Sequence, residues 1–262
     1  MKKWTQWMFL YFMVSGTRSL VEVHQPPVLT TPLGHDVVLP CQFTLSHNER
    51  MVTPPVLYWM CSSQNTDNAR MWPISDKYEG RVALLDNNRS SSNKSIILKN
   101  VQWADSGKYL CKMSITTERE KSFRKRGNET LLMVYDTMIF NLSCHNDSLL
   151  WCEANVTRDS RFVLSIFLDG CRLPTASSAR GDAAAALPYA TLSEATTLSR
   201  GGKYECQLHL NNELITKSFF HYHPPEPSEA VFPEPWCLYA ALLLVPATIL
   251  LSLLTSWLLC RC

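Results

Sequence analysis

The sequence lacks the short motifs by which many nucleotide-binding and hydrolytic enzymes are recognised. It holds no Walker motif, no G-x-G-x-x-G run and no G-x-S-x-G run. The group His221-Tyr222-His223 is not accompanied by any Cys-x2-Cys/His spacing of a zinc site. We therefore expect no enzymatic activity, no cofactor and no metal.

The sequence also lacks a large excess of charge of either sign. The 262 residues carry 25 Lys and Arg against 23 Asp and Glu, a formal net charge of +2. This balance gives no electrostatic case for binding nucleic acid. Residues 236–259 contain no Asp, Glu, Lys, Arg or His at all. A receptor that recruits a signalling adaptor through an ion pair inside the membrane needs such a residue, so that mechanism is disfavoured.

Both ends of the chain are apolar. Lys2 and Lys3 precede the apolar stretch 7–14 and the small residues 15–17, which predicts a removable signal peptide over residues 1–19. Residues 236–259 are long enough to cross a bilayer, and they follow a proline-rich stalk at 224–235. We expect a single-pass type I protein of the plasma membrane, embedded through this segment.

The C-terminal residues allow two kinds of anchor. In the favoured interpretation, residues 260–262 are a cytoplasmic tail too short to signal, with Cys260 and Cys262 as palmitoylation candidates. In the alternative, the apolar segment is a removed GPI signal, because Ser228-Glu229-Ala230 offers small residues before a spacer. Release by a phosphatidylinositol-specific phospholipase would decide for the second.

Cysteines and sequons point to the secretory pathway. Ten Cys suit an oxidising compartment, where disulfides persist. Six N-x-S/T triplets without a central Pro predict a glycosylated ectodomain; they begin at Asn88, Asn93, Asn128, Asn141, Asn146 and Asn155.

The strongest motif is Asp105-Ser106-Gly107-Lys108-Tyr109-Leu110-Cys111. It follows Cys41, which closes an alternating apolar strand, and Trp59 in the next core strand. Together these residues resemble the immunoglobulin fold, which predicts an all-β protein. The resemblance implies that Cys41 and Cys111 bridge two sheets, that Trp59 packs on the bridge and that Tyr109 fixes the turn before its strand.

The first domain, residues 21–135, resembles the variable type. The spacing 127–134 reads G-x-x-T-x-L-x-V, as in the last variable-type strand. The sequence separation of 70 between Cys41 and Cys111 leaves room for an extra strand pair. The resemblance also implies an ion pair between Arg81 and Asp105.

A second, C2-like domain is predicted over residues 136–223. Gly202-Lys203-Tyr204-Glu205-Cys206 repeats the first motif, which implies a Cys152–Cys206 bridge with Tyr204 in the core. Ile166 stands where a core Trp is expected, and Arg200 where the Asp of the corner motif is expected. The fold class is thus two tandem immunoglobulin-like β-sandwiches, a signal peptide and one C-terminal transmembrane helix.

The remaining cysteines separate possible branches of the superfamily. Cys144, eight residues before Cys152, resembles the second domain of SLAM-type leukocyte adhesion receptors, and we expect a Cys144–Cys171 bridge. The intact bridge of the first domain resembles butyrophilin-type co-stimulatory ligands instead. Cys61 lies two residues beyond Trp59 and so faces inward. A buried unpaired thiol is favoured there, and a further bridge is the alternative.

Partner binding is predicted on the first domain. A basic run between its last two strands occupies the position of the third hypervariable loop of antibodies and contains Arg119, Lys121, Arg124, Lys125 and Arg126. A solvated hairpin tip is the favoured interpretation of this run, and contact with an acidic partner surface is the functional hypothesis. We expect the site on an outward sheet face that includes Tyr58, Met60, Met71, Trp72, Lys112, Met113, Phe123, Arg124, Lys125 and Arg126. The alternative for some of the Met and Trp residues is a place in the core. The tripeptide Arg180-Gly181-Asp182 matches the one that integrins bind, but three residues occur by chance and we expect no integrin contact.

These features predict a surface glycoprotein that binds a protein on another cell through its variable-type domain, as a co-stimulatory ligand or an adhesion molecule, without signalling by itself. Two alternatives remain open. One is a homophilic adhesion molecule, and the other is a receptor subunit that signals through an associated chain.

Overall fold

A computed structural model describes residues 21–47, 49–63, 66–119, 121–143, 146–177, 187–224 and 236–259. Residues 1–222 form one compact unit and residues 223–262 a second. The predicted signal peptide, most of the stalk, the Arg180-Gly181-Asp182 tripeptide and the terminal Cys260 and Cys262 lie outside the described residues.

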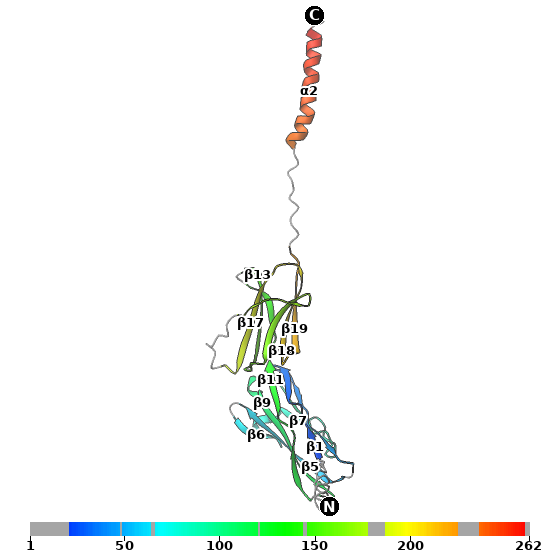
Figure 1. Cartoon of the computed structure of the whole chain (residues 1–262), viewed down its shortest axis with the longest axis vertical. Coiled ribbons are helices and arrows are strands. Elements are labelled where there is room, and N and C mark those ends of the chain that lie inside the picture. Colours follow the sequence, from blue (N-terminus) through cyan, green and yellow to red (C-terminus); the bar gives the residue numbers. More distant parts are fainter. Residues whose placement is uncertain are drawn as a thin grey trace, which may run out of the picture. The chain divides into compact units, whose positions relative to one another are not determined.

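The N-terminal part of the first unit is a β-sandwich (Figure 1). One layer contains the pair β1 (Val21–His24) and β4 (Gln42–Leu45), and a sheet of β3 (Val37–Leu39), β8 (Ile96–Leu98) and β7 (Val82–Leu84). The facing layer is ordered β11 (Thr130–Tyr135), β9 (Gly107–Thr117), β5 (Met51–Ser63) and β6 (Thr66–Trp72). Strand β2 (Val28–Pro32) runs parallel to β11, and β10 (Phe123–Arg126) pairs with β9.

The core of this sandwich is built around the predicted residues. Cys41 and Cys111 form a disulfide between the layers. Trp59 is fully buried beside it, and its indole N–H donates to the carbonyl of Lys94 at 3.0 Å. The buried Tyr109 hydroxyl donates to the carbonyl of Asp105 at 2.6 Å, which is the predicted corner. The disulfide, the indole and the corner therefore organise one core, as expected.

The ion pair implied by the family resemblance is present. The Arg81 guanidinium donates to both carboxylate oxygens of Asp105, which is buried. A second guanidinium contact reaches the carbonyl of Asn100 at 3.0 Å. The hydrogen bonds to Asp105 raise the pKa of Arg81 above its ordinary value. Asp105 also accepts from the backbone N–H of Gln102, so it holds the short helix η2 (Trp103–Asp105) before β9.

The predicted extra strand pair is only partly present. Strand β6 supplies one additional strand at the edge of the β9–β5 layer. Residues 73–81 after it contain a short 3-10 helix, η1 (Asp76–Tyr78), and no strand. Pro73 offers no N–H to a ladder, and Tyr78 is buried in the core, so this segment crosses between layers instead of extending the sheet.

A second sandwich follows in the same unit. One sheet is ordered β12 (Ile139–Ser143), β13 (Asn146–Thr157), β17 (Tyr189–Thr197) and β16 (Ala176–Ser177). The other is ordered β15 (Cys171–Arg172), β14 (Phe162–Leu168), β18 (Gly202–Leu210) and β19 (Glu213–Tyr222). Cys152 and Cys206 join the two sheets.

The two departures noted in the second motif have local explanations. Ile166 is fully buried opposite Cys206, so a smaller side chain fills the place of the expected Trp. Arg200 keeps the corner through its backbone, because its carbonyl accepts from the Tyr204 hydroxyl at 3.0 Å. The Arg200 side chain lies 3.7 Å from the carboxylate of Asp169. The corner needs a carbonyl at this position and not a particular side chain.

Strand β11 takes part in both cores. Leu132 and Val134 are buried in the first, whereas Met133 is buried in the second. Thr157 of β13 fixes the junction: its hydroxyl accepts from the N–H of Val134 at 2.8 Å and donates to the carbonyl of Val134 at 3.1 Å. The same hydroxyl lies 2.9 Å from that of Ser106. The two cores therefore meet within a strand and do not separate cleanly after residue 135.

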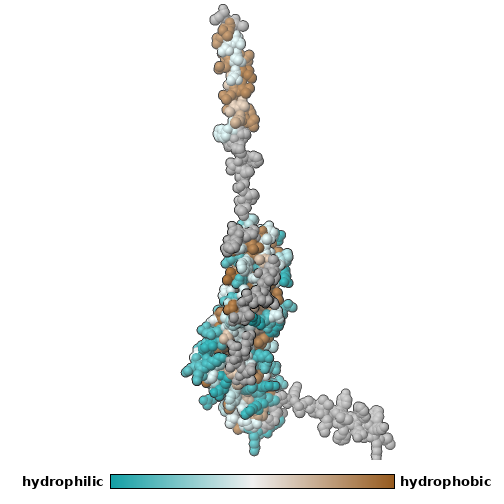
Figure 2. Space-filling view, turned by 90° about the vertical axis from the view of Figure 1, so that its left-hand side faces the viewer, coloured by the Kyte–Doolittle hydropathy of each residue, from teal (hydrophilic) through white to brown (hydrophobic). Residues whose placement is uncertain are grey.

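Helix α2 (Trp236–Leu259) has the bounds predicted for the membrane segment and is long and apolar enough to cross a membrane. Figure 2 shows apolar side chains along it. The hydroxyls of Thr248, Ser252 and Thr255 donate to carbonyls three residues earlier at 2.8–2.9 Å. These three hydroxyls are thus satisfied without water, as a hydrocarbon environment requires.

Candidate functional site

The outward face of strands β5, β9 and β10 brings together half of the predicted binding residues, namely Tyr58, Met60, Lys112, Arg124 and Arg126. The strand register places Tyr58 of β5 opposite Lys112 of β9, and Lys112 opposite Arg126 of β10, so the three residues form a row across the strands. The next row contains Val56, Ser114 and Arg124. Because directly opposed residues of neighbouring strands share a face, these side chains form one surface. We call it the basic face, defined by Val56, Tyr58, Met60, Lys112, Ser114, Arg124 and Arg126.

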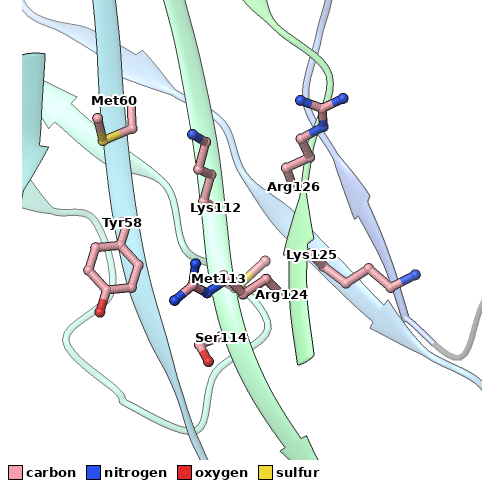
Figure 3. A pocket seen from close by; sticks show the side chains of 8 residues that line it. All are labelled: Tyr58, Met60, Lys112, Met113, Ser114, Arg124, Lys125 and Arg126. Carbon is pink, nitrogen blue, oxygen red and sulfur yellow. The ribbon is translucent and has the colours of Figure 1, made fainter. Parts of the chain in front are cut away.

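The basic face is hollowed. A shallow cavity of about 560 Å³ is lined by its residues other than Val56, together with Met113 and Lys125 (Figure 3). Tyr58 borders it from β5 and is 38% exposed, although it is a large aromatic residue. Half-buried Met60 lies one pair further along the same strand. An exposed aromatic ring and a flexible thioether beside a depression are features of protein contact surfaces.

The charge of this face is positive. No carboxylate is within ion-pair distance of Lys112, Arg124 or Arg126 among the residues that the structure describes. Lys108, further along β9, is different because its amine is 3.0 Å from Glu129. The three cations therefore keep their charge available to a ligand, and they are held on paired strands and not on a mobile loop tip.

Three predicted members of the site lie outside the basic face, although Lys125 still contributes to the lining of its cavity. Trp72 is half-buried against the first core and is paired with the buried Trp59. Phe123 packs on the same core, opposite the buried Ile115. Lys125 is paired with the buried Met113, and its side chain extends away from Tyr58 (Figure 3).

Met71 and Met113 are buried core residues, which is the alternative left open for the Met and Trp side chains, although Met113 contributes to the lining of the cavity. For Phe123 and Lys125 the cause of the different orientation is local. The basic run forms strand β10 from residue 123 onward, and strand alternation then sends every second side chain inward. Ser114 was missed, although the alternation of Lys108, Leu110 and Lys112 along β9 would have placed it outward.

The start of the basic run is held by a buried carboxylate. The backbone N–H of Arg119 donates to Glu49 Oε1 at 3.4 Å, and its guanidinium lies 3.6 Å from Glu49 Oε2. The Glu49 side chain is fully buried. This contact ties the loop after β9 to the loop before β5, so Arg119 has a structural partner that Arg124 and Arg126 lack among the described residues.

The free cysteines of the described residues differ in their exposure to solvent. Cys61 is a buried free thiol, which confirms the favoured prediction for it. Burial raises its pKa, while polar contacts with Tyr109 and Tyr78 act in the opposite direction. Cys171 is an exposed free thiol, so the predicted Cys144–Cys171 bridge is wrong; Cys144 lies outside the described residues. Strand β15 with Cys171 is at the far edge of its sheet from β19, the strand that β12 approaches.

We expect alkylation at pH 8 to distinguish these thiols. The thiolate is the reactive form, so a buried thiol with a raised pKa reacts slowly. Native protein should be labelled at Cys171 within minutes and at Cys61 only after unfolding, as read by peptide mass mapping. Cys237 provides an internal comparison. Rapid native labelling of Cys61, or protection of Cys171 until a reductant is added, would contradict this assignment.

The other predicted modification sites are partly described. Asn88, Asn128 and Asn141 are exposed, and Asn93 and Asn155 are half-buried. The Asn93 Oδ1 atom accepts from the backbone and hydroxyl of Ser95 at 3.1 and 2.6 Å. Asn146 begins β13, but its side chain lies outside the described part. The described residues contain no group of His, Cys, Asp and Glu that could hold a metal ion.

The match to a family model supports the fold of the first sandwich. Residues 24–135 match the family model of the immunoglobulin V-set domain. The chain is 29% identical over 122 residues to the human cell surface A33 antigen, which covers 43% of this chain and 37% of that protein. It thus spans little more than a third of the length of this relative. Among solved structures, murine CRIg matches with 17% identity and a TM-score of 0.37, over 44% of this chain and 98% of the other. Residues 24–135 are thus an immunoglobulin V-set domain.

Proposed function

We propose that this protein is a cell-surface glycoprotein that binds a protein on another cell through the basic face of its V-set domain. The observation that carries the proposal is the row Tyr58–Lys112–Arg126, in which an exposed aromatic residue adjoins two cations on three paired strands. Aromatic and Arg side chains contribute most of the energy at protein interfaces. Rigid strands reduce the entropy lost on binding.

Charge defines the partner further. A surface with Lys112, Arg124 and Arg126 attracts a partner surface rich in Asp and Glu. It repels a second copy of itself, because an isologous contact would bring like charges together. The basic face therefore supports binding to a distinct acidic protein and disfavours homophilic pairing through this surface.

The membrane and the glycans complete the proposal. Helix α2 is suited to hold the protein in the plasma membrane, and the similarity to a cell surface antigen agrees with that location. We propose that the part before the stalk is extracellular and N-glycosylated at the predicted sequons. The absence of charged residues from α2 supports a role in which the partner's cell responds, as for a ligand or an adhesion molecule.

A single substitution can test the face by covering it. Lys112→Asn creates an N-x-S sequon with Met113 and Ser114, in the centre of the basic face. Cells displaying the full chain are applied to an array of cell-surface ectodomains, and bound ectodomains are scored. We expect the attached glycan to abolish binding of the partner that the unmodified chain captures, because it occupies the hollow beside Tyr58.

The matched control places a glycan elsewhere. Leu214→Asn creates a sequon with Ile215 and Thr216 at an exposed position of β19, in the second sandwich. This variant should bind as the unmodified chain does. Retained binding by a Lys112→Asn chain with an occupied sequon would exclude the basic face, and self-capture of this protein as the main partner would favour the homophilic alternative.

A further inference from the structure

An exposed tryptophan lies directly beside a sequon in the second sandwich. Trp151 of β13 is 43% exposed and is paired with Asn141 of β12. On its other side it is paired with Ala195 of β17. Leu150 and Cys152, its chain neighbours, are both buried, so Trp151 points outward together with Asn141 and Ala195.

The spacing within this row suits a stacking contact. The Cβ atoms of directly opposed residues on an antiparallel pair are about 4.5–5.5 Å apart, which brings the Asn141 amide next to the indole. The small Ala195 leaves the indole uncovered on that side. An exposed fraction of 43% for so large a side chain leaves on the order of 100 Å² of aromatic surface in contact with solvent.

We propose that Trp151 is the packing platform for the first N-acetylglucosamine of an N-glycan on Asn141. One side of that pyranose ring presents C–H groups, which are weakly positive and apolar, and the face of an indole is negative and apolar. Contact of the two surfaces removes apolar area of both from water. The glycan is tethered one strand away, so little translational freedom is lost when it packs.

A second sequon flanks the same face. Asn155 lies four residues beyond Trp151 on β13, and its Oδ1 accepts from the hydroxyl of Thr191 on β17 at 2.8 Å. Residues i and i+4 of a strand share a face and are about 13 Å apart. Glycans on Asn141 and Asn155 would enclose Trp151 from two directions. This surface is thereby assigned to carbohydrate of the chain itself and not to a protein partner.

The inference rests on the proposed extracellular location. The experiment below distinguishes failure of the glycan contact from failure of that location. The full chain is produced in mammalian cells, sequon occupancy is mapped, and oxidation of each Trp by hydroxyl radicals is measured by mass spectrometry. We expect Asn141 to be occupied and Trp151 to be protected. Asn141→Gln should raise Trp151 oxidation several-fold, while the buried Trp59 stays protected and shows that the fold is intact.

Two matched variants complete the design. Ser143→Thr keeps the sequon of Asn141 and should keep the protection, whereas Asn128→Gln removes a glycan from the first sandwich and should not expose Trp151. Enzymatic removal of the glycan from the native wild-type chain gives the same readout if Asn141→Gln fails to fold. Equal oxidation with and without the glycan, or an empty Asn141 beside an occupied Asn155, overturns the inference alone. No occupied sequon overturns the extracellular location as well.

Discussion

Trp59→Ala should lower the free energy of unfolding of the first sandwich by about 3–5 kcal/mol. Trp59 is fully buried on the Cys41–Cys111 disulfide, so truncation leaves a cavity between two sheets held at a fixed separation. It also removes the only indole donor to the Lys94 carbonyl among the described contacts. A carbonyl left unpaired in a core adds its own desolvation cost.

Hydrogen–deuterium exchange of peptides from β9 measures this loss in the first sandwich by itself. Tyr58→Ala is the matched control, since it changes the adjacent residue of the same strand on the outward face. It should alter stability by less than about 0.5 kcal/mol. A loss as large for Tyr58→Ala as for Trp59→Ala would mean that the two faces of β5 have been assigned wrongly.

The double charge reversal Arg124→Glu with Arg126→Glu should slow association with the captured partner by about tenfold or more at low salt. Both side chains lie on the basic face, and neither has a carboxylate within ion-pair distance in the described part of the chain. Each reversal replaces attraction of an acidic surface by repulsion. The association rate of the unmodified chain should fall as salt is added, and that of the variant should depend on salt far less.

Lys99→Glu is the control for this experiment. Lys99 is exposed and follows β8 in the other layer of the same sandwich, so reversal there changes the formal net charge by half as much as the double variant does, without touching the basic face. Surface kinetics at two or more salt concentrations supply the readout. An effect of Lys99→Glu about half as large on the logarithm of the association rate would indicate a response to overall charge, and unchanged kinetics in the double variant would remove the acidic-partner hypothesis.

The sequence was sufficient to predict the parts of the fold that depend on local spacing. The disulfides of Cys41 and Cys152, the buried Trp59 and the corners of Tyr109 and Tyr204 all follow from short motifs. The bounds of α2 follow from an uninterrupted apolar run. In each case the structure is determined by a few residues that are close in the sequence, or by the apolar composition of one segment.

The basic face was predicted in part, because it depends on pairing between strands. Tyr58, Met60 and Lys112 lie on the outward face as expected, but Phe123 and Lys125 were assigned to a loop in which alternation has no meaning. Strand β10 exists because β9 is long enough to pair with it. The Cys144–Cys171 bridge failed for a similar reason, since sheet order places β15 away from β12 and spacing along the chain does not reveal that order.

Strand β11 restricts where this protein can be divided into separate domains. Its alternate side chains belong to different cores, with Leu132 and Val134 in one and Met133 in the other. A chimera cut after Tyr135 would carry Met133 away and leave a void in the sandwich that remains. The two sandwiches are therefore not interchangeable modules. A graft of either sandwich into another protein must include a strand that supplies the side chains of β11 to both cores.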